Sequence, residues 1–221
     1  MSVFILKLIA LFFMIIDHIG HFFITNEYYV LFRILGRIAA PIFLFLFVEG
    51  YLKTSNRKKY QNRLLIASTI MFIGNIILSF FCSNMYPLNT NIIFTMLLCS
   101  LFLDNIESNR SIKYKILIGL LLLIPIYFAE YSFIALLCVI IFYLYRKQYI
   151  SKILMCLIYF FTFISYCLLI NNVLQMFMIL ALIPILLYNG KLGFKNKFVQ
   201  QFYYWFYILH LWIFVIITSF M

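Results

Sequence analysis

Charged residues are scarce in this sequence, and their scarcity excludes a soluble domain. Only 10% of the 221 residues are charged, whereas 67% are hydrophobic and 21% are aromatic. Apolar runs occur along the whole chain, and no soluble core of this size could bury them. The composition therefore predicts an integral membrane protein.

Proline and glycine are also few, and they form no linker. The four prolines and seven glycines are scattered, and we find neither a low-complexity segment nor a repeat. We therefore expect a single domain over residues 1–221. Transporter sites are typically built from repeated halves with matched segments broken by glycine or proline, so the lack of such halves argues against a transporter.

Cysteine forms no motif. The five cysteines lie apart within apolar segments, with no C-x-x-C pair and no histidine at a spacing suited to zinc. We interpret them as small apolar residues, and we expect no metal cofactor.

Basic residues, in contrast, outnumber acidic ones by 17 to 6, which gives a net charge of +11. They concentrate in four short blocks between apolar segments, at residues 53–63, 109–115, 146–152 and 191–197. The positive-inside rule predicts that these blocks are cytoplasmic loops, so the charge indicates membrane orientation rather than a nucleic-acid partner. The connections "TNEYY", "CSNMYPLNTN", "AEYS" and "NN" contain no lysine or arginine and are expected outside.

The apolar segments between these loops predict an all-α, polytopic transmembrane bundle of about nine helices. Approximate spans are 3–24, 28–52, 64–82, 90–104, 116–129, 131–145, 153–170, 173–188 and 202–220. Helix is favoured because the alternation of a membrane barrel is missing. The count puts the N-terminus in the cytoplasm and the C-terminus outside. Three segments, 90–104, 116–129 and 131–145, are shorter than the ~20 residues that a full span needs.

Ionisable residues interrupt the first two apolar segments. The run "FFMIIDHIGHFF" contains Asp17, His18 and His21, and "FRILGRIAAPIF" contains Arg33 and Arg37. A rise of 1.5 Å per residue places Asp17 about 21 Å above the inner end, and the arginines roughly 7 and 13 Å below the outer surface. The two segments therefore carry facing ionisable stripes in one layer, because each i, i+4 pair shares a helix face.

Two interpretations of this layer remain open. Asp17 and an arginine could form a structural ion pair that clamps the two helices. However, a buried arginine costs ~2.5–3.5 kcal/mol on insertion scales, and two arginines against one aspartate leave a positive charge, unless Glu27 or Glu130 near the outer surface balances it. The alternative is an electropositive pocket for a carboxylate, a phosphate or a developing oxyanion.

A third histidine extends the polar layer. His210 in "FYYWFYILHLWIF" lies about 12 Å above the inner start of the last segment, close to the depth of Arg37. Glu49, near the inner end of the second segment, would continue a polar column from Lys53 to His18. Such a column could hold a long amphipathic cofactor.

Several stretches together resemble the TraX family, which is named for a conjugative-pilin acetylase. They are "IDHIG", "RILGRIAAPIFLFLFVEG" followed by "NRKKY", "NIIFTMLL" and the final "FYILHL". The family is similar to a wider superfamily of multi-span acyltransferases that act on sugars and cell-wall polymers. The chain departs from the family pattern at Ile208 and at Gly74-Asn75. The resemblance implies a multi-pass protein of the bacterial cell membrane, in contact with lipids.

The resemblance further implies transfer of an acetyl group from acetyl-CoA to an acceptor at the outer face. The acceptor would be a peptide amine, such as that of pilin, or an envelope saccharide. A histidine held by a neighbouring carboxylate is the usual base for such a step, so we predict that His18 is the base, oriented by Asp17 or a neighbour. Arg33 and Arg37 would stabilise the oxyanion or hold the thioester.

The remaining polar residues are assigned to substrate or donor binding. His210 would position the thioester, while the basic loops attract the phosphates of CoA. The other residues in this group are His21, Glu49, Glu130 and Asn91. Two competing classes remain, namely a transporter or flippase for an anionic lipid or metabolite, and a non-enzymatic assembly partner.

Overall fold

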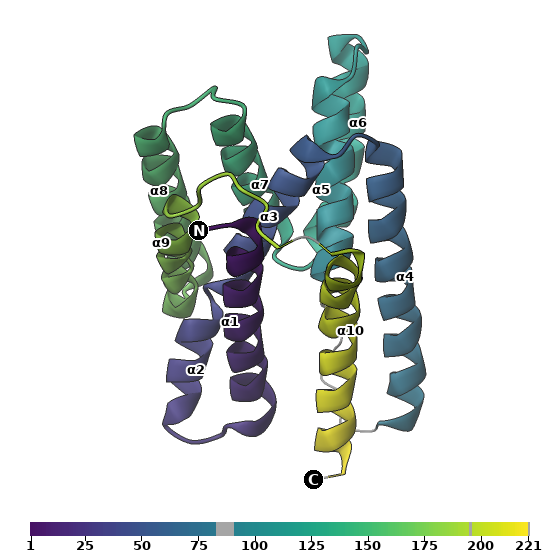
Figure 1. The fold of residues 1–221 in the computed structure, drawn as a ribbon, viewed down its shortest axis with the longest axis vertical. Coiled ribbons are helices and arrows are strands. Elements are labelled where there is room, and N and C mark those ends of the chain that lie inside the picture. Colours follow the sequence, from purple (N-terminus) through teal and green to yellow (C-terminus); the bar gives the residue numbers. More distant parts are fainter. Residues whose placement is uncertain (83–90, 195, 221) are drawn as a thin grey trace.

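The computed structural model describes residues 1–82, 91–194 and 196–220 (Figure 1), and these residues form helices and connections without a strand. The helices are α1 (Val3–Phe23), α2 (Tyr28–Gly36), α3 (Ala39–Lys53), α4 (Arg57–Phe81), α5 (Ile92–Glu107), α6 (Ile112–Phe128), α7 (Ser132–Arg146), α8 (Lys152–Ile170), the 3-10 helix η1 (Val173–Ala181), α9 (Leu182–Leu186) and α10 (Lys197–Ser219). Each predicted span matches one helix or one consecutive pair, which confirms the all-α bundle.

Within the described residues, four helical stretches are long and apolar enough to cross a membrane. They are α1, the 26-residue stretch made by α2 and α3, α4 and α8. Helices α5, α6 and α7 are shorter, at 16, 17 and 15 residues. This agrees with the sequence, which predicted short segments at these three positions.

The turn between α6 and α7 lies inside the bundle. The Thr95 hydroxyl, near the start of α5, donates a hydrogen bond to the backbone carbonyl oxygen of Glu130 at 3.0 Å. Arg37, about 14 Å along its helix from Tyr28, lies within electrostatic range of Glu130. Glu130, which the sequence placed near the outer surface, therefore lies at a turn that packs against the start of α5. Its depth in the membrane stays a prediction.

The basic blocks at residues 53–63, 109–115 and 146–152 lie towards the upper end of Figure 1, and the connection that leads into α10 begins lower. A hydrogen bond from Lys53 to the backbone oxygen of Gly190 links that connection to the first block. Ion pairs join the blocks at 53–63 and 146–152 through the end of α5: Glu107 pairs with Arg57 and, at 2.9 Å, with Lys147. Glu49 pairs with Arg146 and, at 2.7 Å, with Lys53. The expectation that these loops share one side is confirmed. That this side faces the cytoplasm stays a prediction.

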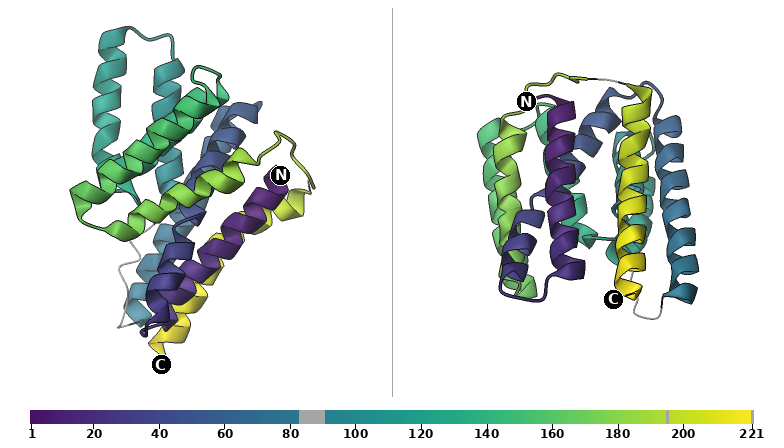
Figure 2. Two further views of the ribbon diagram at one scale, coloured as in Figure 1. Left: turned by 90° about the vertical axis from the view of Figure 1, so that its left-hand side faces the viewer. Right: turned by 60° about the horizontal axis from the view of Figure 1, so that its bottom comes forward.

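Helix α1 is packed between the α2–α3 stretch and α10. Helix α10 runs beside α1 and α4, as the right-hand view of Figure 2 shows. Two glycines permit the close approaches. A Cβ atom at Gly36 would lie 2.2 Å from Cβ of Asp17, and one at Gly74 would lie 1.9 Å from Cζ2 of Trp212. Any side chain at either position would push the facing helix away.

Candidate functional site

Two histidines from opposite ends of the chain meet in the bundle. Nδ1 of His18, on α1, lies 2.9 Å from Nε2 of His210, on α10. His210 is buried, and the Phe206 ring is stacked on its imidazole with 5.4 Å between centroids. The sequence placed both residues in the polar membrane layer, and the structure brings their rings into direct contact.

The hydrogen bonds of this pair determine the tautomer of each ring. Nδ1 of His210 lies 2.7 Å from the backbone oxygen of Phe206. A carbonyl oxygen only accepts, so Nδ1 of a neutral His210 carries the proton and its Nε2 is an acceptor. Nδ1 of His18 must then donate to it, which leaves a lone pair on Nε2 of His18. The arrangement prepares His18 as a base.

Asp17 is engaged by the two arginines. Its Oδ1 lies 3.0 Å from Nη1 of Arg33 and 3.1 Å from Nη2 of Arg37. Asp17 therefore clamps α1 to the α2–α3 stretch, as the structural interpretation predicts. The sequence predicted that Asp17 or a neighbouring residue orients His18. The Asp17 carboxylate faces the arginines, and the residue hydrogen-bonded to the His18 ring is His210.

A small residue makes this ion cluster possible. Gly36 lies next to Arg37, and its missing side chain leaves the space that the Asp17 carboxyl group occupies. Both arginines can then reach the same carboxylate from one side of α1. The stretch "RILGR" thus combines the two charges with the gap that receives their partner.

Glu130 does not pair directly with either arginine. It lies within electrostatic range of both Arg37 and Asp17, but the ion pairs of the described residues join both arginines to Asp17, and the buried Oε2 atom of Glu130 has no hydrogen-bond partner among them. Glu27, the other candidate, is exposed in the connection between α1 and α2. Two arginines therefore share one carboxylate, and the surplus positive charge of this layer stays a prediction.

The predicted polar column does not include Glu49. This carboxylate is bound at the basic end by Lys53, Arg146 and the Tyr188 hydroxyl, which donates to it at 2.7 Å. Apolar side chains of α3 and α5 lie between this end and the histidines. Glu49 therefore joins helices at the basic end, and an apolar cavity stands where the column was expected.

A family model described as TraX protein matches residues 2–218. The chain belongs to the TraX family. The match spans the histidine pair, the Asp17 cluster and all four basic loops, so the TraX assignment concerns the whole bundle. No curated protein and no solved structure matches the chain significantly.

Two further predicted site residues lie in other surroundings. Asn91 is the N-cap of α5, where its side-chain oxygen accepts from the backbone N–H of Phe94 at 3.1 Å. Its amide group donates to the backbone oxygen of Ser68, on α4, at 3.1 Å. His21 lies edge-on to the Phe22 ring with 5.2 Å between centroids. Asn91 thus has a structural role that needs no substrate.

The structure adds residues that the sequence did not single out. Trp212 donates through Nε1 to the Asn75 side-chain oxygen at 3.0 Å, which ties α10 to α4 two residues beyond His210. Nη1 of Arg37 lies 3.5 Å from the side-chain oxygen of Gln175 in η1. One signal in the sequence pointed to the contact between Trp212 and Asn75, namely that Gly74-Asn75 departs from the TraX family pattern.

Proposed function

We propose that this protein is a membrane acetyltransferase in which His18 is the general base. The donor is acetyl-CoA, which approaches from the basic end. The acceptor is an amine at the N-terminus of a peptide such as pilin, or a hydroxyl group of an envelope saccharide. Membership of the TraX family supports acetyl transfer as the reaction class.

The observation that carries this proposal is the hydrogen-bonded chain from Phe206 through His210 to His18. A base needs a lone pair aimed at its substrate, and a positioned side chain typically accelerates proton transfer 10²–10⁴-fold. The backbone oxygen of Phe206 holds His210, and His210 holds the His18 ring with Nε2 as its basic atom.

The reaction follows from that polarity. Nε2 of His18 removes a proton from the acceptor as the acceptor nitrogen or oxygen attacks the thioester carbonyl carbon. The tetrahedral intermediate then expels the thiolate of CoA, which takes the proton from the His18 imidazolium. The acetyl group ends on the acceptor, and the protein returns to its starting protonation state.

Arg33 is the better placed of the two arginines to stabilise the oxyanion. Its Nη1 is engaged by Asp17, while Nε and Nη2 make no hydrogen bond within the described residues. Arg37 uses donors on Nε, Nη1 and Nη2. Free donors aimed at developing negative charge are the usual means of lowering such a barrier. We therefore assign the electrostatic role to Arg33 and the structural role to Arg37.

The test measures acetyl-CoA turnover by purified protein in nanodiscs, with a pilin N-terminal peptide as acceptor. We expect His18→Ala to lower kcat at least 100-fold. His210→Phe should also lower kcat, whereas His210→Gln should retain more activity because its amide oxygen can accept from Nδ1 of His18. Thermal unfolding of each variant separates lost chemistry from lost folding.

Two results would reject the proposal. His18→Ala could unfold at a lower temperature yet keep normal turnover per folded molecule, which would make the histidine pair structural. Alternatively, wild-type protein could show no turnover with any acceptor while moving an anionic metabolite into sealed vesicles, which would favour a transporter.

A further inference from the structure

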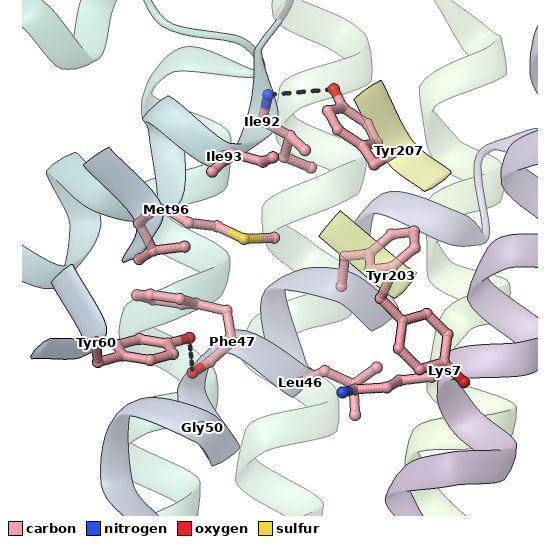
Figure 3. Close-up of a pocket in the computed structure, with 12 residues that line it drawn as sticks. Lys7, Leu46, Phe47, Gly50, Tyr60, Ile92, Ile93, Met96, Tyr203 and Tyr207 are labelled. Atoms are coloured by element: carbon pink, nitrogen blue, oxygen red, sulfur yellow. Dashed lines mark hydrogen bonds between the residues drawn. The ribbon is translucent and has the colours of Figure 1, made fainter. Parts of the chain in front are cut away.

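An elongated cavity lies between the basic end and the histidine pair (Figure 3). Its volume is about 170 Å³, and helices α1, α3, α4, α5 and α10 line it. The walls are mostly aliphatic and aromatic, and they include Leu46, Met96 and Tyr203. Neither the histidine pair nor the Asp17 cluster lines this cavity.

Lys7 brings a positive charge into the cavity. Its Nζ points between α3 and α10 in Figure 3 and lies 4.7 Å from the centroid of the Tyr203 ring. Within the described residues Lys7 has no carboxylate partner, although all six acidic residues of the chain are described. A lysine inside a membrane bundle is costly and points to a functional site.

A second cation lies outside the wall of the cavity. Arg63, on α4, lies over the ring of Tyr60, which lines the cavity, with 5.6 Å between the guanidinium carbon and the ring centroid. Arg63 is exposed and, like Lys7, pairs with none of the carboxylates that bind Lys53, Arg57, Arg146 and Lys147. Among the described residues that line the cavity, Lys7 therefore carries the positive charge.

The other end of the cavity approaches the proposed base. Tyr207 lines the cavity, and its ring centroid lies 5.9 Å from that of His210, one helical turn further along α10. On α1, Lys7 precedes His18 by eleven residues, which corresponds to about 16 Å. The cavity thus runs from a cation at the basic end towards the histidines.

We propose that this cavity binds the phosphopantetheine arm of the acyl donor, with Lys7 contacting its phosphate. The inference rests on the proposed function and adds the route by which the thioester reaches His18. The arm has roughly twelve bonds between its phosphate ester oxygen and its sulfur, the length of about four extended residues or 14 Å. The contact of the phosphate with Lys7 at one end and that of the thioester with His18 at the other account for the rest of the distance between these two residues.

The chemistry of the walls suits this arm. Its methylene and dimethyl groups are apolar and thin, so they fit a narrow cavity lined by Leu46, Met96 and tyrosine rings. Its phosphate is an anion at one end, which matches a cavity whose described lining has a single cation, Lys7.

The test uses binding rather than turnover, so it is independent of the chemical step. Affinities of 4′-phosphopantetheine and of pantetheine, which lacks the phosphate, are measured by calorimetry on protein in nanodiscs. We expect wild type to bind 4′-phosphopantetheine about tenfold or more tightly than pantetheine. Lys7→Gln should abolish that difference while leaving pantetheine affinity unchanged. Lys59→Gln, an exposed lysine of α4, is the matched control and should behave as wild type.

A second variant tests the cavity itself. Met96→Trp should fill part of the space and weaken both probes equally, with thermal unfolding used to verify the fold. Tighter binding of CoA than of 4′-phosphopantetheine identifies the free coenzyme as the source of the arm, and competition by a phosphopantetheinylated carrier protein identifies the carrier.

The inference is overturned if Lys7→Gln still distinguishes the two probes as wild type does, or if wild type binds neither. If the wild type still transfers acetyl groups in that case, the proposed function is retained, and the donor reaches His18 by a different route. The opposite result is also distinguishable. If probe binding depends on Lys7 but His18→Ala retains full turnover, His18 is not the base, while the cavity remains the binding site of the phosphopantetheine arm.

Discussion

At the scale of single residues, the candidate site depends on which hydrogen-bond partner each polar side chain has. His18 and Asp17 are adjacent in the sequence, yet one faces α10 and the other faces the α2–α3 stretch. The two neighbours thus have separate functions. Asp17 holds the helices together, and His18 is free of that ion cluster to act as the base in the proposed reaction.

The two arginines should respond differently to the same substitution. Lysine retains the charge but loses the planar fork of donors. Arg37 makes hydrogen bonds to Arg33, Gln175 and Asp17, so Arg37→Lys should lower the temperature of thermal unfolding by several degrees. Arg33→Lys should unfold near the wild-type temperature and lower kcat about tenfold or more. Equal losses of stability for both variants would contradict the division of roles.

At the scale of helices, the position of α10 decides whether His210 can reach His18. Trp212 contacts α4 through the hydrogen bond to Asn75 and through the space that Gly74 leaves open. Since α10 carries His210, any displacement of α10 from α4 also moves the proposed relay. The link between α4 and α10 is therefore needed to position the site, although its residues take no part in the proposed reaction.

Gly74→Ala should displace α10. The added methyl group would meet the Trp212 indole at 1.9 Å, and overpacking of this kind typically costs 1–3 kcal/mol. We expect a lower unfolding temperature, together with a loss of acetyl transfer from the altered pairing of His18 and His210. Gly119→Ala is the matched control, because the atoms nearest to its Cβ would be 3.8 Å away. If Gly74→Ala behaved like this control, the contact would not position α10.

At the scale of the whole molecule, ion pairs at the basic end hold together helices that differ in depth. Partial burial alone would raise the pKa of Glu107, but hydrogen bonds from Tyr143, Lys147 and Arg57 outweigh it and lower this pKa to about 2. Glu107 thereby links the end of α5 to α4 and α7. We call this network of ion pairs at the basic end, from which the short helices extend, the frame.

Glu107→Gln should weaken this frame. The variant leaves Arg57 and Lys147 without their shared carboxylate, so its unfolding temperature at pH 7 should fall. A lowered pKa stabilises the folded state above the ordinary value near 4.5, and this stabilisation is lost as the pH falls towards about 2. The difference between wild type and variant should therefore stay constant above pH 5 and shrink below pH 4.

Glu27→Gln serves as the control for this experiment, because Glu27 is exposed in the connection between α1 and α2. Its unfolding temperature should equal that of the wild type at every pH. A difference for Glu107→Gln that does not change between pH 7 and pH 3 would show that the carboxylate charge is not what stabilises the frame.

The sequence by itself determined the helices, the common end of the basic loops and the layer shared by Asp17, His18 and Arg37. These properties are local: apolar run length predicts a span, loop charge predicts its side, and the helical rise converts residue number into depth. The α5, α6 and α7 segments were also recognisably short. Family membership was visible from motifs in order along the chain.

Only the tertiary structure decided which of these groups touch. His18 and His210 are separated by 192 residues, and depth alone does not say whether two helices turn the same face towards each other. Helix rotation is decided by packing, and here two missing side chains, at Gly36 and Gly74, permit the close contacts that set it. For the same reason the sequence did not predict the position of the α6–α7 turn, which carries Glu130: its contact with Thr95 of α5 depends on how the neighbouring helices pack.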